Sequence, residues 1–297
     1  MRITVFTSTF NRIDKLTVLY KSLLNVNFKD FEWIIIDDGS TDDTQRVVNE
    51  WLQRKTPFNI TYVKKENGGK HRAINLGVQM AKGDLFYIVD SDDWLPPEAL
   101  SRIDYFEKSI NPEIKSNFAG VCGLRGTDSH TPIGTTFDTG VFVDITYLQR
   151  KEYKISGDKA EVFYTKVLKQ YNFPEFVNEN FLTEAYIWNE IALDGLKMRY
   201  FNEIIYIGNY LNDGLTKNYW DVYKRNPQGY GLFINQLVKL KQIRFYSKWE
   251  AYSLFYKLNK NAISKRQIIE YLKCSSISLN SSLFLYRIFK FYGSKRR

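Results

Sequence analysis

The chain has few of the residues that mark secreted or membrane-spanning proteins. It contains two cysteines, Cys122 and Cys274, which stand far apart and show no Cys-x-x-Cys spacing. A disulfide framework is therefore not expected, and a reducing cytoplasm is the expected compartment. Residues 1–10 lack the long apolar run of a signal peptide, and no apolar run reaches the roughly 18 residues needed to span a bilayer. These absences predict a cytoplasmic protein, either soluble or peripheral on a membrane.

Acidic residues are scarce only in the last fifth of the chain. Residues 239–297 hold 14 Lys and Arg against two acids, Glu250 and Glu270, whereas residues 1–238 hold 28 basic and 31 acidic residues. The net charge of +9 is therefore carried by the C-terminal segment. This asymmetry predicts an anionic partner for the C-terminal segment and not for the rest of the chain. No recognised nucleic-acid-binding motif accompanies it, so nucleic acid is not expected as the partner.

The first third of the chain alternates strand and helix patterns. Strand patterns cover residues 3–9, 33–36, 60–63 and 85–89, and helical patterns cover residues 14–24, 40–54 and 70–81. A further helix is expected to start near Pro96 and Pro97. Repeated strand–helix–strand units with short links predict an α/β fold with a doubly wound, mostly parallel sheet. Ligands of such sheets bind beyond the carboxyl ends of the strands.

The pattern changes after residue 118. Short strands and Gly/Thr-rich turns are expected up to residue 153, followed by helices over residues 158–171 and 183–193. Beyond residue 226 the chain is helical in pattern and strongly basic. We therefore expect two domains, a catalytic α/β domain over residues 1–225 and a helical, basic extension over residues 226–297.

The strand over residues 85–89 is followed by Asp90-Ser91-Asp92-Asp93. Carboxylates at i and i+2 of an extended segment point the same way, so Asp90 and Asp92 can reach one cation. Hard oxygen ligands suit Mg²⁺ or Mn²⁺, which also bind phosphate oxygens. The alternative is a solvated turn in which Asp93 caps the next helix. The position after a buried strand of a doubly wound sheet favours the metal site.

Two further polar segments follow strands of the same predicted sheet. Asp38 lies in Asp37-Asp38-Gly39-Ser40, and its carboxylate can accept from the imide of uracil or from a ribose hydroxyl, although Asp-Gly-Ser is also ordinary turn sequence. Asn67-Gly68-Gly69-Lys70-His71-Arg72 opens a helix. Its glycines allow a ligand to approach the backbone, and Lys70 and Arg72 can face phosphate. A glycine loop with surface cations is the alternative.

In this order and spacing, the segments resemble the family 2 glycosyltransferases, which have a GT-A fold. The resemblance rests on residues 7–12 (TSTFNR), 34–42 (IIIDDGSTD), 67–77 (NGGKHRAINLG), 81–84 (AKGD) and 90–93 (DSDD), and it covers about residues 1–100 clearly. It implies that Thr7, Thr9 and Arg12 line the nucleoside pocket. It also implies that Asn67, Lys70 and Arg72 follow the ribose and diphosphate, and that Asp90, Ser91 and Asp92 form the metal and donor site. Among these, Asp92 is the expected direct ligand of the metal.

The general base departs from the family pattern. Many members carry a Glu-Asp pair at the start of a helix, but residues 181–188 read FLTEAYIW, with Ala185 in place of that Asp. We expect Glu184 to be the base and Trp188, one turn later, to be a platform for the acceptor. Alternatively, Glu184 only favours the helix N-terminus and Trp188 is a core residue. Glu179 and Asp194 are the reserve candidates for the base.

Together these features predict an inverting, metal-dependent glycosyltransferase. The expected donor is a nucleotide sugar, preferably UDP-linked, the cofactor is Mn²⁺ or Mg²⁺, and the acceptor is a glycan or a lipid-linked hydroxyl compound. By analogy, a role in bacterial surface polysaccharide or glycoconjugate synthesis is expected. Two rivals stay open: a sugar nucleotidyltransferase, although residues 7–12 lack the glycine of its usual loop, and a non-catalytic module that binds nucleotide sugars or membranes.

The C-terminal segment contains an amphipathic helical pattern over residues 282–292. Leu285, Ile288, Phe289 and Tyr292 share one face, while Arg287 and Lys290 lie opposite. Aromatic residues on one side and cations on the other favour docking on the anionic inner face of the cell membrane. The alternative is a helix that packs on the catalytic domain.

Overall fold

The computed structural model describes residues 1–137, 140–208, 219–240 and 248–293, with side chains up to residue 288. The chain forms two compact units, one made of Met1–Phe173 with Ile187–Tyr210 and the other of Pro174–Tyr186 with Leu211–Arg297. The division near residue 210 differs from the predicted boundary at residue 225. The reason is that helix α7 (Tyr219–Arg225) packs on α8 (Pro227–Lys239) and so belongs with the C-terminal helices.

The first unit contains an eight-stranded sheet, as far as the described residues show, in the order β3-β2-β1-β4-β7-β5-β8-β6. Its first half is parallel and consists of β1 (Ile3–Thr9), β2 (Phe31–Asp37), β3 (Asn59–Lys64) and β4 (Leu85–Ile88). All seven residues of β2 are buried, as expected of a strand that is covered on both faces. The predicted doubly wound, mostly parallel sheet is confirmed.

The second half of the sheet corrects one prediction. Residues 158–171 were expected to be helical, but they form strand β7 (Lys159–Tyr164) and the short helix α5 (Thr165–Leu168). β7 runs antiparallel between β4 and β5 (Phe118–Gly126), and this pairing overrides a local helix preference. β8 (Lys197–Ile207) lies parallel to β5, and β6 (Phe142–Ile145) pairs antiparallel with β8.

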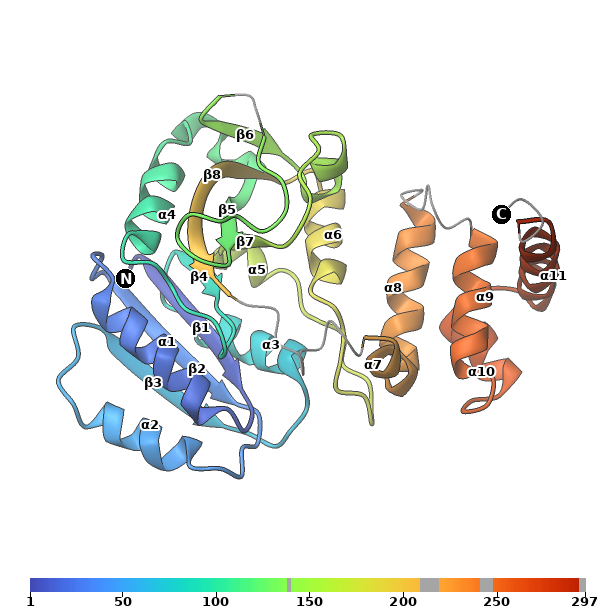
Figure 1. Cartoon of the computed structure of the whole chain (residues 1–297), viewed down its shortest axis with the longest axis horizontal. Helices are drawn as coiled ribbons and strands as arrows, with labels where there is room; N and C mark the ends of the chain where they lie inside the picture. The colour runs from blue at the N-terminus through green and yellow to red at the C-terminus, as the bar shows by residue number, and fades with distance from the viewer. Residues whose placement is uncertain (138–139, 209–218, 241–247, 294–297) are drawn as a thin grey trace. The chain divides into compact units, whose positions relative to one another are not determined.

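Helices cover both faces of this sheet (Figure 1). They are α1 (Ile13–Asn25), α2 (Thr44–Leu52), α3 (Lys70–Met80), α4 (Ala99–Lys108) and α6 (Ala185–Leu193), and short 3-10 turns η1 (Pro112–Asn117) and η2 (Tyr147–Lys151) join the later strands. On α1, Leu16, Leu19, Tyr20 and Leu23 form an apolar stripe that is buried. α2 begins at Thr44 and not at Ser40, because Ser40 and Thr41 are bound to Asn11 in the preceding loop.

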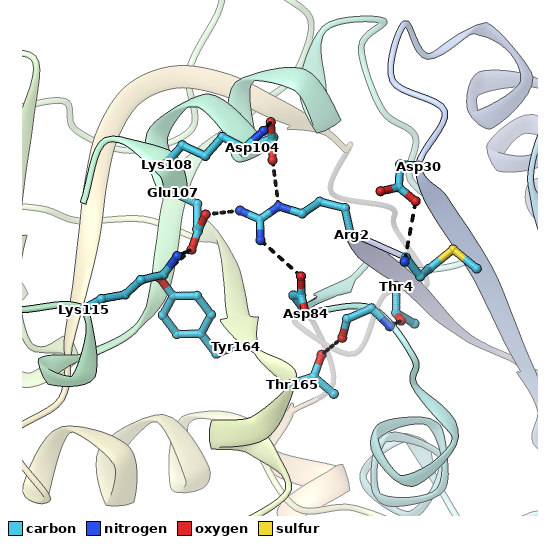
Figure 2. Close-up of polar contacts among 12 residues, drawn as sticks. Arg2, Thr4, Asp30, Asp84, Asp104, Glu107, Lys108, Lys115, Tyr164 and Thr165 are labelled. Atoms are coloured by element: carbon cyan, nitrogen blue, oxygen red, sulfur yellow. Dashed lines mark hydrogen bonds and ion pairs between the residues drawn. The ribbon is translucent and has the colours of Figure 1, made fainter. Parts of the chain in front are cut away.

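The amino-terminal edge of the sheet is held by an ion network around Arg2 (Figure 2). Its guanidinium bonds to Asp104 at 2.7 Å and to Glu107, and it pairs with Asp84 at 3.4 Å. Glu107 is fully buried and is also bound by Lys115 and by the Tyr164 hydroxyl at 2.8 Å. The network ties β1, α4 and β7 together at the end of the sheet opposite the predicted site.

The second unit is helical and has its own core. α9 (Lys248–Asn259), α10 (Lys265–Tyr271) and α11 (Ser276–Gly293) follow α7 and α8. The buried cluster of this unit comprises Tyr230, Ile234, Ala251, Tyr252, Phe255, Ile268, Leu272 and Leu279. No helix in the described part of the chain is both long enough and apolar enough to cross a bilayer.

Candidate active site

The predicted site residues meet at the carboxyl ends of β1 to β4. Arg12 Nη1 lies 2.7 Å from Asp92 Oδ2, although the two residues are 80 positions apart in the sequence. Lys70 Nζ lies 2.5 Å from Asp90 Oδ1. The structure therefore joins the loop after β1, the start of α3 and the Asp90–Asp93 loop through two ion pairs. Each carboxylate that was predicted to bind a metal has a side-chain cation beside it.

The Asp90–Asp93 loop is held from behind by β5 and β8. The Tyr206 hydroxyl accepts from the Asp90 amide at 3.0 Å and donates to Asp93 Oδ2 at 2.5 Å. Arg125 stacks 4.0 Å above the Tyr206 ring, and its Nη1 lies 3.7 Å from Asp90 Oδ2. These two residues fix the loop to the antiparallel half of the sheet.

The adjacent carboxylates Asp90 and Asp93 have opposite electrostatic surroundings. Burial disfavours the charged form of Asp90, but the charges of Lys70 and Arg125 outweigh it and hold its pKa well below the ordinary value. Asp93 is buried beside the negative Asp90, and the two effects raise the pKa of Asp93 to about 7. Asp90 is thus held in its charged form, while Asp93 acts as a buried hydrogen-bond acceptor for Tyr206.

Asp38 organises the glycine loop. Its two carboxylate oxygens accept from the Gly68 amide at 2.9 Å and the Gly69 amide at 2.8 Å, and Lys65 also binds one of them. The Asn67 side-chain amide donates to the Asp38 carbonyl at 2.9 Å. Gly69 has a φ of 92°, a conformation that favours glycine. Asp38 and Asn67 are therefore in contact, and in this structure they shape the loop that opens α3.

The remaining residues of the predicted nucleoside and donor pocket differ in accessibility. Thr7 is fully buried and its hydroxyl accepts from the Trp33 indole at 3.0 Å, so its contact with a nucleoside stays a prediction. Thr9 is also buried, and its hydroxyl has no hydrogen-bond partner among the described residues. Ser91 is buried within its loop, and the Arg72 side chain lies against Gly68.

The predicted acceptor side has a different arrangement. Trp188 is only 7% exposed and packs on Phe163, with ring centroids 4.3 Å apart, and on Phe173. A ring enclosed in this way is a core residue and gives an acceptor sugar little face to stack on. Glu184 directly precedes α6, is half-buried, and lies in the segment that belongs to the second unit.

The two reserve candidates for the base already have structural partners. The Glu179 carboxylate accepts from the Gln228 amide at 2.7 Å and the Gly229 amide at 2.8 Å, so it caps the N-terminus of α8. Asp194 accepts from the Tyr171 hydroxyl at 2.5 Å. Glu184 stays the prediction for the base.

Sequence reasoning missed the residues that support the Asp90–Asp93 loop from the second half of the sheet. Arg125 and Tyr206 belong to β5 and β8, and neither strand is a neighbour of β4 in the sheet. Glu161 and Arg150 lie near them, because the charge of Arg125 acts on Glu161. A lone Arg or Glu in a short strand gives no local signal of this kind, and only the strand order brings these residues to the site.

Comparison with solved structures defines the class of fold. The chain matches Staphylococcus aureus TarS residues 1–349 in complex with UDP-GlcNAc with a TM-score of 0.61, 18% identity and coverage of 97% of this chain and 92% of that chain. It also matches the mannosyltransferase PcManGT from Pyrobaculum calidifontis in complex with GDP-Man and Mn²⁺, with a TM-score of 0.55, 17% identity and coverage of 97% and 75%. The fold is that of the GT-A glycosyltransferases.

Sequence comparison finds a family match in the N-terminal part. Residues 4–108 match the family described as Glycosyl transferase family 2. A curated relative, the GalNAc(5)-diNAcBac-PP-undecaprenol beta-1,3-glucosyltransferase of Campylobacter jejuni, is 30% identical over 195 residues. That match covers 63% of this chain, and the chain spans 58% of the length of that relative. The predicted resemblance and fold class are confirmed.

Proposed function

We propose that this chain is an inverting glycosyltransferase that moves a sugar from a UDP-linked donor to an acceptor hydroxyl. The observation that carries the proposal is the pairing of Arg12 with Asp92 and of Lys70 with Asp90 at the carboxyl edge of the sheet. Two cations for a diphosphate and two carboxylates for a divalent metal thus share one place. The UDP-GlcNAc bound to TarS supports the choice of donor. The name of the Campylobacter jejuni relative supports a lipid-linked acceptor in bacterial surface glycan synthesis.

The residues present fit a divalent cation. Asp90 and Asp92 offer hard carboxylate oxygens, and the Mn²⁺ in the complex of PcManGT supports a metal at this place in the fold. Within the described residues no group of three or more His, Cys, Asp and Glu side chains stands ready to hold a metal. Diphosphate oxygens and water would therefore complete the coordination, as Mg²⁺ and Mn²⁺ ordinarily accept. Bound there, the metal would stabilise the charge that develops on the leaving diphosphate.

Each side chain of the proposed site has its own role in the transfer. Arg12, Lys70 and Arg72 neutralise the diphosphate, while Asp38 and Asn67 hold the glycine loop against the nucleoside. Glu184 accepts the proton of the acceptor hydroxyl as that oxygen attacks the anomeric carbon, because an alcohol is a weak nucleophile without a base. One base and one displacement invert the anomeric centre, and no covalent intermediate is needed.

The test is incubation of the purified protein with Mn²⁺ and a panel of UDP-, GDP- and TDP-sugars. We expect release of a nucleoside diphosphate from one donor, loss of that release in EDTA, and loss in Asp92→Ala. Glu184→Gln should keep donor binding and lose transfer; unchanged transfer would instead support another base or a non-catalytic module. If no nucleotide sugar bound to the wild-type protein in the presence of Mn²⁺, the proposed function would be wrong.

The second unit supports a peripheral place on the cytoplasmic face of the cell membrane. On α11, Leu279 and Ser282 face the helical core, and four apolar side chains stand on the opposite side: Ile277 (78% exposed), Phe284 (64%), Leu285 (45%) and Ile288 (39%). We call these four residues the α11 stripe. The segment from residue 239 onward also carries the basic excess of the chain. Exposed apolar side chains in a basic segment suit an anionic lipid surface.

A further inference from the structure

Glu161 on β7 is a mostly buried carboxylate that the proposed mechanism does not use. Its side chain is 12% exposed, and its recorded side-chain partner is Arg150, whose Nη1 lies 3.7 Å away. That separation is an ion pair but is too long for a hydrogen bond. No side chain among the described residues donates a hydrogen bond to it. Burial, partly offset by Arg150 and Arg125, raises the pKa of Glu161. Its own backbone amide donates to it. A carboxylate can accept several hydrogen bonds, so Glu161 has room for further donors.

Two other polar groups near Glu161 have atoms without a hydrogen-bond partner in the described part of the chain. Cys122 pairs in register with Glu161 on one side and with Tyr200 on the other, so the three side chains stand on one face of the sheet. The Tyr200 hydroxyl and Arg150 Nε are buried and have no hydrogen-bond partner in the described part of the chain. The face therefore presents one acceptor group, one donor and one hydroxyl in a small area.

This face lies close to the Asp90–Asp93 loop. Val162 is paired with Tyr87 in antiparallel register, so Glu161 lies across from Ile88, two residues before Asp90. With a strand spacing of about 5 Å and a rise of about 3.3 Å per residue, the backbones of Glu161 and Asp90 are about 8 Å apart. Arg125, 3.7 Å from Asp90, also interacts electrostatically with Glu161. One sugar ring can bridge such a separation.

The chemistry of the face selects the kind of ligand. A phosphate would be repelled by Glu161, and a cation would be repelled by Arg150 and Arg125. A neutral group with many hydroxyls suits both, because each hydroxyl can donate to the carboxylate and accept from the guanidinium. We propose that Glu161 and Arg150 form the subsite for the sugar ring of the donor, next to the diphosphate held at Asp90 and Asp92. This inference rests on the proposed function and specifies it.

The experiment separates the contribution of the sugar to donor affinity from the contribution of the nucleotide. Calorimetry with Mn²⁺ would compare the affinity for UDP with that for UDP-GlcNAc, UDP-glucose and UDP-galactose, in wild type, Glu161→Gln and Arg150→Lys. We expect the wild type to bind one UDP-sugar more tightly than UDP. In both variants the ratio of the UDP-sugar affinity to the UDP affinity should fall about tenfold, because a hydrogen bond from the carboxylate or guanidinium to a sugar hydroxyl is missing. The affinity for UDP itself should stay within about twofold of the wild-type value.

Controls make each outcome decisive. Arg150→Lys keeps the positive charge beside Glu161, and Glu203→Gln, which removes a carboxylate paired with Arg102 elsewhere in the unit, should leave the difference intact. Thermal unfolding checks that each variant folds. An unchanged difference in both variants would overturn the proposal, and so would a wild type that binds no UDP-sugar better than UDP. If the variants lost sugar transfer but kept wild-type donor binding, Glu161 and Arg150 would contact the acceptor and not the donor sugar. Failure of the wild type to bind UDP or any nucleotide sugar would refute the proposed function itself.

Discussion

Lys70 Nζ lies 2.5 Å from Asp90 Oδ1, while Arg12 Nη1 lies 2.7 Å from Asp92 Oδ2, so both carboxylates of the Asp-x-Asp segment already face a side-chain cation. A divalent metal and these cations compete for the same oxygens, whereas a diphosphate attracts the metal and the cations alike. Metal and nucleotide should therefore bind together much better than the metal binds alone.

This competition predicts that removing Lys70 changes two affinities in opposite directions. Lys70→Met should strengthen binding of Mn²⁺ alone by roughly threefold to tenfold, since a competing charge is gone, and should weaken binding of UDP with Mn²⁺ by a similar factor. Calorimetric titrations with MnCl₂ and with Mn²⁺–UDP measure both effects. Arg46→Gln, which removes an exposed cation paired with Asp43 and Glu50, should change neither. If both affinities fell together in Lys70→Met, the competition would be refuted.

The carboxylate of Asp38 should matter for the shape of the glycine loop. Asp38→Asn replaces one of two accepting oxygens by an NH₂ group, which would then face the Gly68 or Gly69 amide. We expect a loss of about 1–3 kcal/mol in the free energy of unfolding, because one buried amide loses its acceptor. Affinity for UDP should fall as well. Urea unfolding and calorimetry measure the two effects, with Asp43→Asn as the exposed control. Full stability with weakened UDP binding would instead make Asp38 a direct nucleoside ligand.

The sequence predicts the parallel half of this fold well and the antiparallel half poorly. Residues 3–9 are rich in β-branched residues and residues 33–36 form an apolar run, so both can be recognised as strands without a partner, and β1 and β2 contain them. Residues 159–164 (KAEVFY) carry no clear alternation, so β7 becomes a strand only because β4 and β5 lie on either side of it.

The same distinction holds for the site. Arg12, Asp38, Lys70 and Asp92 follow strands or open helices and could be selected by position. Thr7 sits at a similar position, but it faces inward on β1, and only the packing of Trp33 reveals this. Trp188 likewise has the spacing of an acceptor platform, and only the rings of Phe163 and Phe173 show that it is core.

The α11 stripe predicts a specific dependence on lipid. The full chain should sediment with vesicles that contain anionic phosphatidylglycerol and much less with phosphatidylcholine vesicles, and binding should weaken as salt rises. Phe284→Ser with Leu285→Ser removes the centre of the stripe without touching the buried Leu279 and Ser282, so folding should persist. We expect at least a roughly tenfold loss of vesicle binding, because two large apolar side chains no longer enter the lipid.

The control for this test is Val18→Ser on α1, which removes an exposed apolar side chain from the first unit. Vesicle binding of this control should match that of the wild type. If the wild-type chain sedimented with vesicles of neither composition, the α11 stripe would not be a lipid-binding surface. Gel filtration of the double variant would then reveal whether the stripe joins two copies of the chain instead.

The Arg2 network of Figure 2 predicts how stability depends on pH. Burial disfavours the charge on Glu107, but the bonds from Lys115, Tyr164 and Arg2 outweigh it, so the folded state holds the pKa of Glu107 below its ordinary value of 4.5. A carboxylate with a lowered pKa contributes stability above its unfolded pKa, and that contribution is lost as the pH falls through the folded pKa. Glu107 should therefore stabilise the chain at neutral pH and progressively less below about pH 4.5.

Glu107→Gln tests this directly. At pH 7 it should lower the free energy of unfolding by about 3 kcal/mol, because Arg2 and Lys115 lose a buried counter-charge. As the pH falls below about 4.5, the wild type loses the same charge, so the difference between the two proteins should shrink. Urea unfolding at a series of pH values measures the difference, and Glu50→Gln, at an exposed pair with Arg46, should show almost none. A difference that stayed constant with pH would mean that Glu107 stabilises the edge through its shape and not through its charge.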